Sequence, residues 1–336
     1  FQRLGIMTLG IVDTAMVARY STIEVGYQGI ANSALASTLI VAIIGLLMGT
    51  MVLTSTAYGA EDYKKCGRIW RRSIPYSLVI GLVGFVICLF GEPILLFLGQ
   101  TEDVARGGGE VIAVLSIGIP MVALMLSSQF FLEGINRPLP GMVLMLIANI
   151  LNIFLNWTLV WGHLGFEPMG VIGSAWATNI VRIFLAISML CYVIFALDRE
   201  KFGLFEKADT TWKSWKKLRH IGYAAGFTNT VEHLGFAALY IFAGLLGTIS
   251  LGALTIAFTT FGVPFMICYG VAGATAVRVG IALGRKDRQD MALAGLCGLA
   301  FNGMICLPLM VILILFPTQI ASLFSTDVLL IAATAP

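Results

Sequence analysis

The chain has 336 residues, of which 58% are hydrophobic and only 12% are charged. A soluble globular protein carries about 25% charged residues, so this composition excludes a soluble domain and indicates a chain that lies mostly in lipid. The formal net charge of +3 gives no indication of a nucleic-acid partner. The six cysteines form no CxxC pair and lie mostly within apolar runs, so we expect neither a disulfide framework nor a metal site built on them.

Apolar runs of about 20 residues, the length that crosses a bilayer as a helix, recur along the whole chain. Backbone groups in lipid must be paired within their own segment, so we expect helices rather than open strands. The predicted spans cover residues 1–20, 27–57, 73–98, 109–133, 139–161, 169–197, 221–248, 252–281 and 291–316, and a tenth begins near residue 327. Apolar runs reach both ends of the sequence, so we expect a longer natural chain.

Basic residues gather at every second connection between the predicted helices. They lie in the segments 61–72, 134–140, 198–220 and 284–290, whereas the intervening connections are nearly bare. Lys and Arg mark the cytoplasmic side of a membrane protein. The pattern therefore places the N-terminus and the exits of the even-numbered helices in the cytoplasm.

The sequence also repeats itself at an offset of about 225 residues. YGAEDYKK at 58–65 is similar to LGRKDRQD at 283–290, and GYQGIA at 26–31 is similar to GALTIA at 252–257. Six predicted helices separate equivalent points, and an even number leaves the two copies in the same orientation. Such copies are related by an axis along the membrane normal, which is a transporter architecture.

This repeat predicts three regions. The N-terminal lobe covers residues 1–197, a basic cytoplasmic linker covers 198–220, and an incomplete C-terminal lobe covers 221–336. The fold class that we expect is an all-α integral membrane protein with two six-helix lobes related by a pseudo-two-fold axis.

Two carboxylates, Asp13 and Glu232, lie deep within predicted spans. A charge at the bilayer centre costs about 2.5–3.5 kcal/mol, so such residues face a bundle interior or a wet cavity. A carboxylate there can exchange a proton, or can bind a hard cation such as Na⁺ when other oxygens complete the shell. A cationic substrate that competes for the same charge would couple the two movements. The alternative is that each acid is held by hydroxyls or amides and only fixes helix packing.

Three amides, Asn149, Asn152 and Asn156, fall on one face of the predicted span 139–161. Their oxygens could coordinate an ion or their amide groups could bond to Asp13. Asparagine also serves as a hydrogen-bonding link between membrane helices, and the two interpretations are equally open.

Aromatic residues of the eighth predicted span suit a pocket for organic cations, because aromatic faces attract positive charge. Phe261 and Phe265, with Asn149, are the candidate substrate-pocket residues, although packing and lipid contact are commoner roles for such side chains. Arg182 in the sixth span is expected to be structural, either reaching the interface or pairing with an acid.

The chain resembles the multidrug and toxic compound extrusion (MATE) family, in its NorM-like bacterial branch. The resemblance is carried, in order, by VDTAMVARYS at 12–21, YGAEDYKKCGR at 58–68, LNIFLNW at 151–157, GVIGSAWAT at 170–178, TVEHLGF at 230–236 and VRVGIALGRKD at 277–287. It implies twelve helices around a central cleft. It also implies export of cationic or amphiphilic drugs and dyes, by alternating access, driven by inward Na⁺ or H⁺ flow.

The resemblance further implies a coupling-cation site formed by Asp13, Asn152, Asn156 and Thr178. Relatives carry an aspartate at the position of Asn156, so this chain departs from the pattern by one charge. Glu232 is implied as the acid of the second lobe, and its partner on a tenth helix lies beyond this sequence.

From these observations we expect a secondary exporter of a bacterial inner membrane, not an enzyme, that acts as a monomer on small cationic molecules with no cofactor besides its coupling ion. One alternative is a flippase for lipid-linked precursors from the same superfamily, which should have a cationic cleft. Another is a membrane acyl or glycosyl transferase, for which the three histidines supply no clustered site. The sequence leaves Na⁺ and H⁺ as alternative coupling ions.

Overall fold

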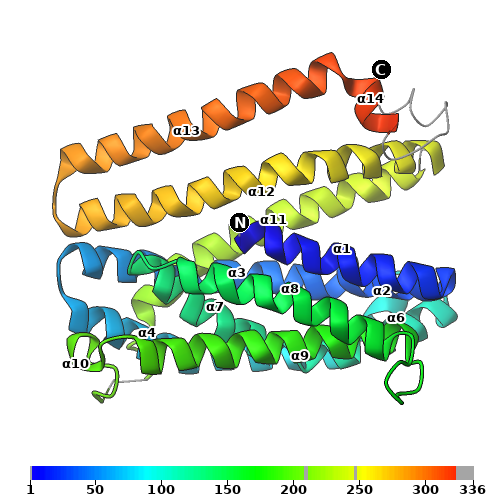
Figure 1. Cartoon of the computed structure of the whole chain (residues 1–336), viewed down its shortest axis with the longest axis horizontal. Helices are drawn as coiled ribbons and strands as arrows, with labels where there is room; N and C mark the ends of the chain where they lie inside the picture. The colour runs from blue at the N-terminus through cyan, green and yellow to red at the C-terminus, as the bar shows by residue number, and fades with distance from the viewer. Residues whose placement is uncertain (1, 208–210, 246–247, 323–336) are drawn as a thin grey trace.

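The computed structural model describes residues 2–207, 211–245 and 248–322, and these ranges contain helices and no strand (Figure 1). In chain order the elements are α1 (Gln2–Tyr20), α2 (Thr22–Ala31), η1 (Asn32–Ala36), α3 (Ser37–Gly59), α4 (Tyr63–Leu89), α5 (Gly91–Phe97), α6 (Glu102–Ser116), α7 (Ile119–Gly134), α8 (Leu139–Leu159), α9 (Gly170–Cys191), η2 (Tyr192–Ala196), α10 (Arg199–Phe202), α11 (Lys216–Leu245), α12 (Thr248–Gly284), α13 (Arg288–Leu315) and α14 (Pro317–Ser322). The predicted tenth span lies outside the described residues.

Six of the described helices are long and apolar enough to cross a membrane, or seven if α6 and α7 count as one bent span. The six are α3, α4, α8, α9 with η2, α12 and α13. The first and seventh predicted spans are also helices, α1 and α11, but both carry charged residues that make them less apolar. The prediction of an all-helical, multi-pass membrane protein is confirmed.

The fourth predicted span is not the single helix that the sequence suggested. Helix α6 ends at Ser116 and α7 begins at Ile119, and the two axes differ by 46°. Pro120 occupies the first turn of α7, where its missing N–H breaks no helical bond. The prediction of one helix over 109–133 is therefore wrong, because Gly118 and Pro120 permit a break.

The basic segment 61–72, expected as a loop, belongs mostly to α4. Asp62 starts this helix, since its carboxylate accepts a hydrogen bond from the Lys65 backbone N–H at 3.1 Å. This is an N-cap, which pairs a donor that the helix itself leaves free. The basic side chains therefore lie on the first turns of a helix.

The second predicted span begins earlier than expected and is interrupted. It runs from α2 through the π-helical turn η1 into α3. Single π turns inserted in α-helices occur frequently at functional sites. Here the turn adds one residue to the helical ladder beside the cavity described below.

Helix α7 forms the centre of the N-terminal helices and packs against α3, α4 and α9. Its large side chains Phe130, Phe131 and Leu126 are almost fully buried. Polar side chains on the neighbouring faces pair with each other: Ser73 and Ser127 hydroxyls lie 2.6 Å apart. This packing makes a rigid support for α9 and hence for the site that α9 contributes to.

Two turns at the same end of the molecule have the same geometry, as the predicted repeat requires. Glu61 and Lys286, 225 residues apart, both adopt left-handed backbone conformations, with φ of 59° and 60°. The aspartate that follows each one caps the next helix: Asp62 caps α4 and Asp287 caps α13. The repeat is thus visible in backbone conformation as well as in sequence.

Helices α3 and α12 cross reciprocally next to these turns. A Cβ on Gly59 would collide with the carbonyl oxygen of Ile281, and one on Gly284 would collide with that of Thr56. The two glycines are equivalent in the repeat, and so are Thr56 and Ile281. The contact is therefore the same from both sides, as a two-fold axis between the helices demands. The limits of the lobes at 197 and 220 stay predictions.

Candidate functional site

Asp13 lies in the middle of α1 with 8% of its surface exposed. Its Oδ1 accepts hydrogen bonds from Asn152 Nδ2 at 3.0 Å and from Asn156 Nδ2 at 2.7 Å. Its Oδ2 accepts one from the Thr178 hydroxyl at 2.7 Å. The structure therefore brings together the four N-terminal residues that the sequence and the resemblance had singled out.

Local helix geometry explains this arrangement. Asn152 and Asn156 are one turn apart on α8, so their side chains share a face. Asn156 Nδ2 also donates to the Asn152 carbonyl at 3.0 Å, which fixes the orientation of its side chain. Helix α1 packs against both α8 and α9, so donors from two helices converge on one carboxylate.

Asp13 borders a cavity of about 400 Å³ that is lined by residues of α1, α2, η1, α3, α6, α7, α8 and α9. Most of the lining is aliphatic or methionine, including Ile40, Met125 and Met145. Gln28 adds a polar group and donates to the Ser174 hydroxyl at 3.5 Å. A mostly apolar cavity with a few convergent polar groups is the usual form of a small-molecule site.

Several buried oxygens at this site have no hydrogen-bond donor among the described residues. They are the side-chain oxygens of Asn152, Asn156 and Gln28. A buried acceptor left unpaired costs free energy. Amide and carboxylate oxygens are also the ligands that hard cations prefer. The amide and carboxylate oxygens at this site are therefore of the kind that binds a small hard cation such as Na⁺.

Arg182 contributes the positive charge of this cavity. It lies one turn beyond Thr178 on α9 and lines the same space as Asp13. Its Nη1 donates to the Leu115 carbonyl at 3.2 Å. The position of this arginine in an apolar run predicted a structural role, and no sequence pattern connected it with Asp13.

Glu232 is not part of this site. It lies on α11 with its side chain exposed, and no hydrogen bond or ion pair of the described residues includes it. Among the described residues, no side chain hydrogen-bonds to Glu232 to form the second carboxylate site, for which Na⁺ was a possible bound ion. Its role stays a prediction.

Two of the three candidate substrate-pocket residues pack together, and the third makes its hydrogen bonds on other helices. Phe261 and Phe265 pack ring against ring on α12, with centroids 5.5 Å apart. Asn149 instead donates from α8 to the Gly5 carbonyl at 3.2 Å and to the Met145 carbonyl at 2.8 Å. None of the three lines the Asp13 cavity. The spacing of Phe261 and Phe265 along α12 does not indicate which residues of other helices lie beside them.

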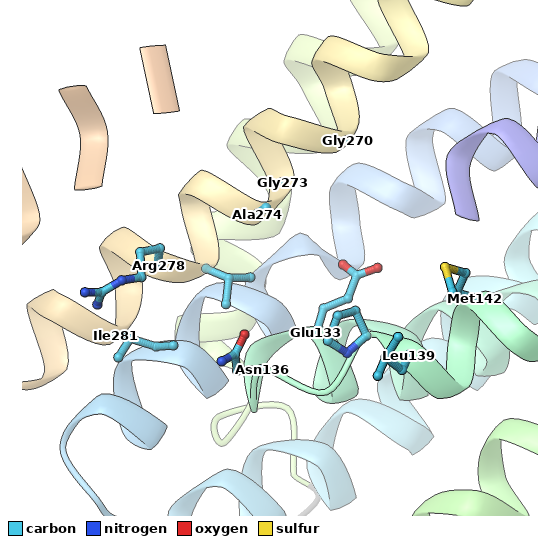
Figure 2. A pocket seen from close by; sticks show the side chains of 11 residues that line it. Glu133, Asn136, Leu139, Met142, Gly270, Gly273, Ala274, Arg278 and Ile281 are labelled. Atoms are coloured by element: carbon cyan, nitrogen blue, oxygen red, sulfur yellow. The ribbon is translucent and has the colours of Figure 1, made fainter. Parts of the chain in front are cut away.

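A second hollow of about 260 Å³ lies between the corner of α7 and α8 and the facing side of α12. Glu133 lines it and accepts a hydrogen bond from Gln129 Nε2 at 2.8 Å. Figure 2 shows the Arg278 side chain pointing away from Glu133. Arg278 is engaged elsewhere, in a two-bond pair with Asp290 at 2.8 and 3.0 Å. The lining of this hollow therefore contains one acid, Glu133, and one cation, Arg278, whose charge is paired with Asp290.

The sequence missed one carboxylate that positions α9. Glu24 Oε2 accepts a hydrogen bond from the Val171 backbone N–H at 2.6 Å, at the first turn of α9. Gly170 has a φ of +54° and allows the carboxylate to approach closely. The signal was present, because a glycine before an apolar run marks a tight turn, but the distant acid could not be identified from it.

The fold and the site define a multi-pass helical membrane protein with a buried carboxylate facing an interior cavity. The MatE family model matches residues 1–158 and 224–335, and the chain belongs to this family. The "Probable multidrug resistance protein NorM" of Caulobacter vibrioides is 34% identical over 99% of this chain and 71% of its own length. The "Multidrug resistance protein PmpM" of Pseudomonas aeruginosa is 28% identical over 99% of this chain and 70% of its own length.

Solved structures have the same fold. The crystal structure of the eukaryotic MATE transporter AtDTX14 superposes with a TM-score of 0.87 at 19% identity, covering 99% of this chain and 74% of that one. A MOP superfamily transporter from Pyrococcus furiosus, whose binding pocket is described as having reverse polarity, superposes with a TM-score of 0.81 at 17% identity, covering 99% of this chain and 75% of that one. The resemblance found in the sequence is confirmed for the family and the fold.

Proposed function

We propose that the protein exports cationic and amphiphilic organic compounds by alternating access, in exchange for Na⁺ or H⁺ that enters at Asp13. The observation that carries the proposal is the Asp13 carboxylate, buried beside a cavity and bonded to two amides and one hydroxyl from two other helices. The multidrug-resistance names of the relatives support the class of substrate. The protein then needs no catalytic group and no cofactor besides the coupling ion.

The coupling follows from charge. A proton or a sodium ion at Asp13 neutralises the carboxylate, and an organic cation in the cavity requires its negative charge. Binding of one therefore weakens binding of the other, and each can drive release of the other on opposite sides of the membrane. The aliphatic and methionine lining suits apolar bodies of varied shape.

We further propose that the protein is a monomer in a bacterial inner membrane, with the basic end in the cytoplasm. The α3–α4 and α12–α13 connections and α10 lie at one end of the molecule (Figure 1). These connections carry the Lys and Arg residues of the sequence pattern. Basic loops favour the cytoplasmic side, which supports this orientation.

The flippase alternative requires a cavity that holds a pyrophosphate through several cations. The described lining of the Asp13 cavity contains one cation, Arg182, and one acid. This balance favours the exporter. No observation on the described residues favours the transferase.

The proposal is tested with the full-length protein in proteoliposomes that contain a fluorescent cationic dye. Dye movement is followed under an imposed Na⁺ gradient and then under a pH gradient, for wild type and for Asp13→Asn. We expect one gradient to drive transport and Asp13→Asn to abolish it. Asp103→Asn, which neutralises an exposed acid at the start of α6, is the matched control.

Glu232→Gln in the same assay asks whether the second predicted acid also carries coupling. Loss of gradient-driven transport would support a second site, and wild-type transport would assign coupling to Asp13 alone. If neither gradient drives transport by wild type, or if Asp13→Asn equals wild type, the proposed function is wrong.

A further inference from the structure

Arg182 and Asp13 are the two charged residues among the described lining of the cavity. Their helices are linked directly, because Thr178, one turn before Arg182 on α9, donates to Asp13 Oδ2 at 2.7 Å. The two charges attract each other across the cavity. The ion pairs of the described residues, which join charged atoms within 4.0 Å, do not include Arg182 with Asp13. The attraction between these two charges therefore acts over a longer distance.

The guanidinium is held instead at the break between α6 and α7. Its Nη1 donates to the Leu115 carbonyl at 3.2 Å, and the neighbouring Asn179 amide donates to the Val114 carbonyl at 2.6 Å. These carbonyls belong to the last turn of α6, where the helix dipole favours positive charge. Arg182 thus has a fixed resting place that is separate from Asp13.

Gly118 makes this place available. A Cβ at Gly118 would lie 2.8 Å from Arg182 Cδ and would also collide with the Asn179 side chain. The glycine therefore leaves room for both α9 side chains at the break. The helix break, Gly118 and the donors Asn179 and Arg182 therefore form one connected arrangement at the end of α6.

The surroundings of the guanidinium contain few other charges. The charged or titratable groups that interact with it are Asp13 from α1 and Cys88 from α4. An arginine keeps its proton in proteins, so its charge does not depend on the state of Asp13. The cavity therefore always contains one positive charge beside its carboxylate.

We propose that Arg182 is the resident counter-ion of Asp13 and sets the affinity of this carboxylate for the coupling cation. With no cation bound, the guanidinium offsets the negative charge of Asp13. When a cation arrives, it meets the repulsion of Arg182, so binding is weaker and release is easier. This inference rests on the proposed function of Asp13. Arg182 acts through Asp13 and is a positioning residue.

The experiment measures how dye efflux from proteoliposomes depends on the concentration of the coupling cation, Na⁺ or H⁺, for wild type and Arg182→Gln. Removing a like charge across a cavity should lower the half-saturating concentration on the order of ten-fold. Arg182→Lys keeps the charge and should keep the wild-type value. Arg106→Gln, which removes an exposed cation of α6, is the matched control.

A purely structural arginine would give a different result. Arg182→Gln and Arg182→Lys would then both lower thermal stability without moving the half-saturating concentration, and this outcome would overturn the inference. A wild type that transports without any cation dependence would instead overturn the proposed function.

A thermal double-mutant cycle keeps the inference testable if Arg182→Gln transports poorly. Asp13→Asn leaves the arginine without its counter-charge and should lower the melting temperature, as should Arg182→Gln. The double variant should recover part of the loss, since neither charge is then unpaired. Additive losses would show that the two charges are not coupled and would overturn the inference.

Discussion

Ser55 in α3 lies against Gly280 in α12, its own equivalent 225 residues further along the chain. The Ser55 side chain occupies the space that a Cβ on Gly280 would need, with Ser55 Cβ 3.0 Å from that position. A residue that contacts its own equivalent must lie on the axis that relates the two copies. The crossing of α3 and α12 is therefore where the pseudo-two-fold axis passes, at the end of the molecule that carries the basic connections.

Gly284→Ala should weaken this crossing. The added methyl group would collide with the Thr56 carbonyl and would lie 2.8 Å from the Ala60 backbone nitrogen. Backbone atoms cannot move aside, so we expect a cost of about 1–3 kcal/mol. The measurement is the melting temperature of the purified protein in detergent. Gly295→Ala on α13 is the control, because open space surrounds that position and alanine favours a helix there. Equal melting temperatures for both variants would contradict the close contact.

Asn152→Ala should impair coupling while Asn149→Ala should not. Asn152 donates to Asp13 from its Nδ2, and its buried amide oxygen has no hydrogen-bond donor among the described residues. Asn149, on the same helix, donates to Gly5 and Met145 carbonyls and does not touch Asp13. Loss of a partner that orients a cation ligand costs roughly ten-fold or more in affinity or activity. Cation-driven dye efflux measures the effect, and equal losses in both variants would show that the amides only hold helices together.

Glu24→Ala should destabilise the protein through α9. The Glu24 carboxylate accepts a bond from Val171 N–H at the positive end of that helix. Removing such a cap costs about 1 kcal/mol. Glu24→Gln keeps an acceptor and should lose less. Melting temperatures rank the variants, with Glu102→Ala, an exposed acid at the start of α6, as the control. A Glu24→Ala protein as stable as wild type would show that solvent replaces the cap without cost.

The N-terminal site was predictable from the sequence because its signals are local. Asp13 is a charge within an apolar run, and the spacing of Asn152 and Asn156 places both amides on one face of one helix. Their contact with Asp13 required only that α1 and α8 be neighbours. Thr178 came from the family resemblance alone.

The features that the sequence did not predict depend on contacts between distant segments. The cap that Glu24 gives to Val171 joins residues 147 positions apart, and the bond from Arg182 to Leu115 joins residues 67 positions apart. The bend between α6 and α7 combines Gly118 with two side chains of α9 that donate to the Val114 and Leu115 carbonyls. Periodicity within one helix contains no information about such partners.

The ion pair between Lys64 and Glu206 should make a small contribution to stability that disappears in acid. The two groups lie 2.9 Å apart at the surface, and the hydrogen bond and charge of Lys64 lower the pKa of Glu206. A lowered folded-state pKa adds stability above the ordinary glutamate value of about 4.3 and loses it as the pH falls through the folded-state value. The melting temperatures of wild type and Glu206→Gln should therefore differ slightly at pH 7 and converge as the pH falls through the folded-state pKa of Glu206. A difference that grows in acid would contradict this sign.

Oxidative cross-linking should join α12 to α13. The sulfur atoms of Cys268 and Cys306 lie 2.9 Å apart, and both thiols are free. With copper phenanthroline and oxygen as the oxidant, each thiol loses one proton and one electron and a sulfur–sulfur bond forms. We expect two fewer thiols to react with a maleimide, and mass spectrometry of peptides should find the linked pair. Cys268→Ser should prevent the loss, whereas Cys191→Ser, which removes an exposed cysteine of α9, should not. An intact count of reactive thiols in oxidised wild type would show that these two helices are not paired at this level of the membrane.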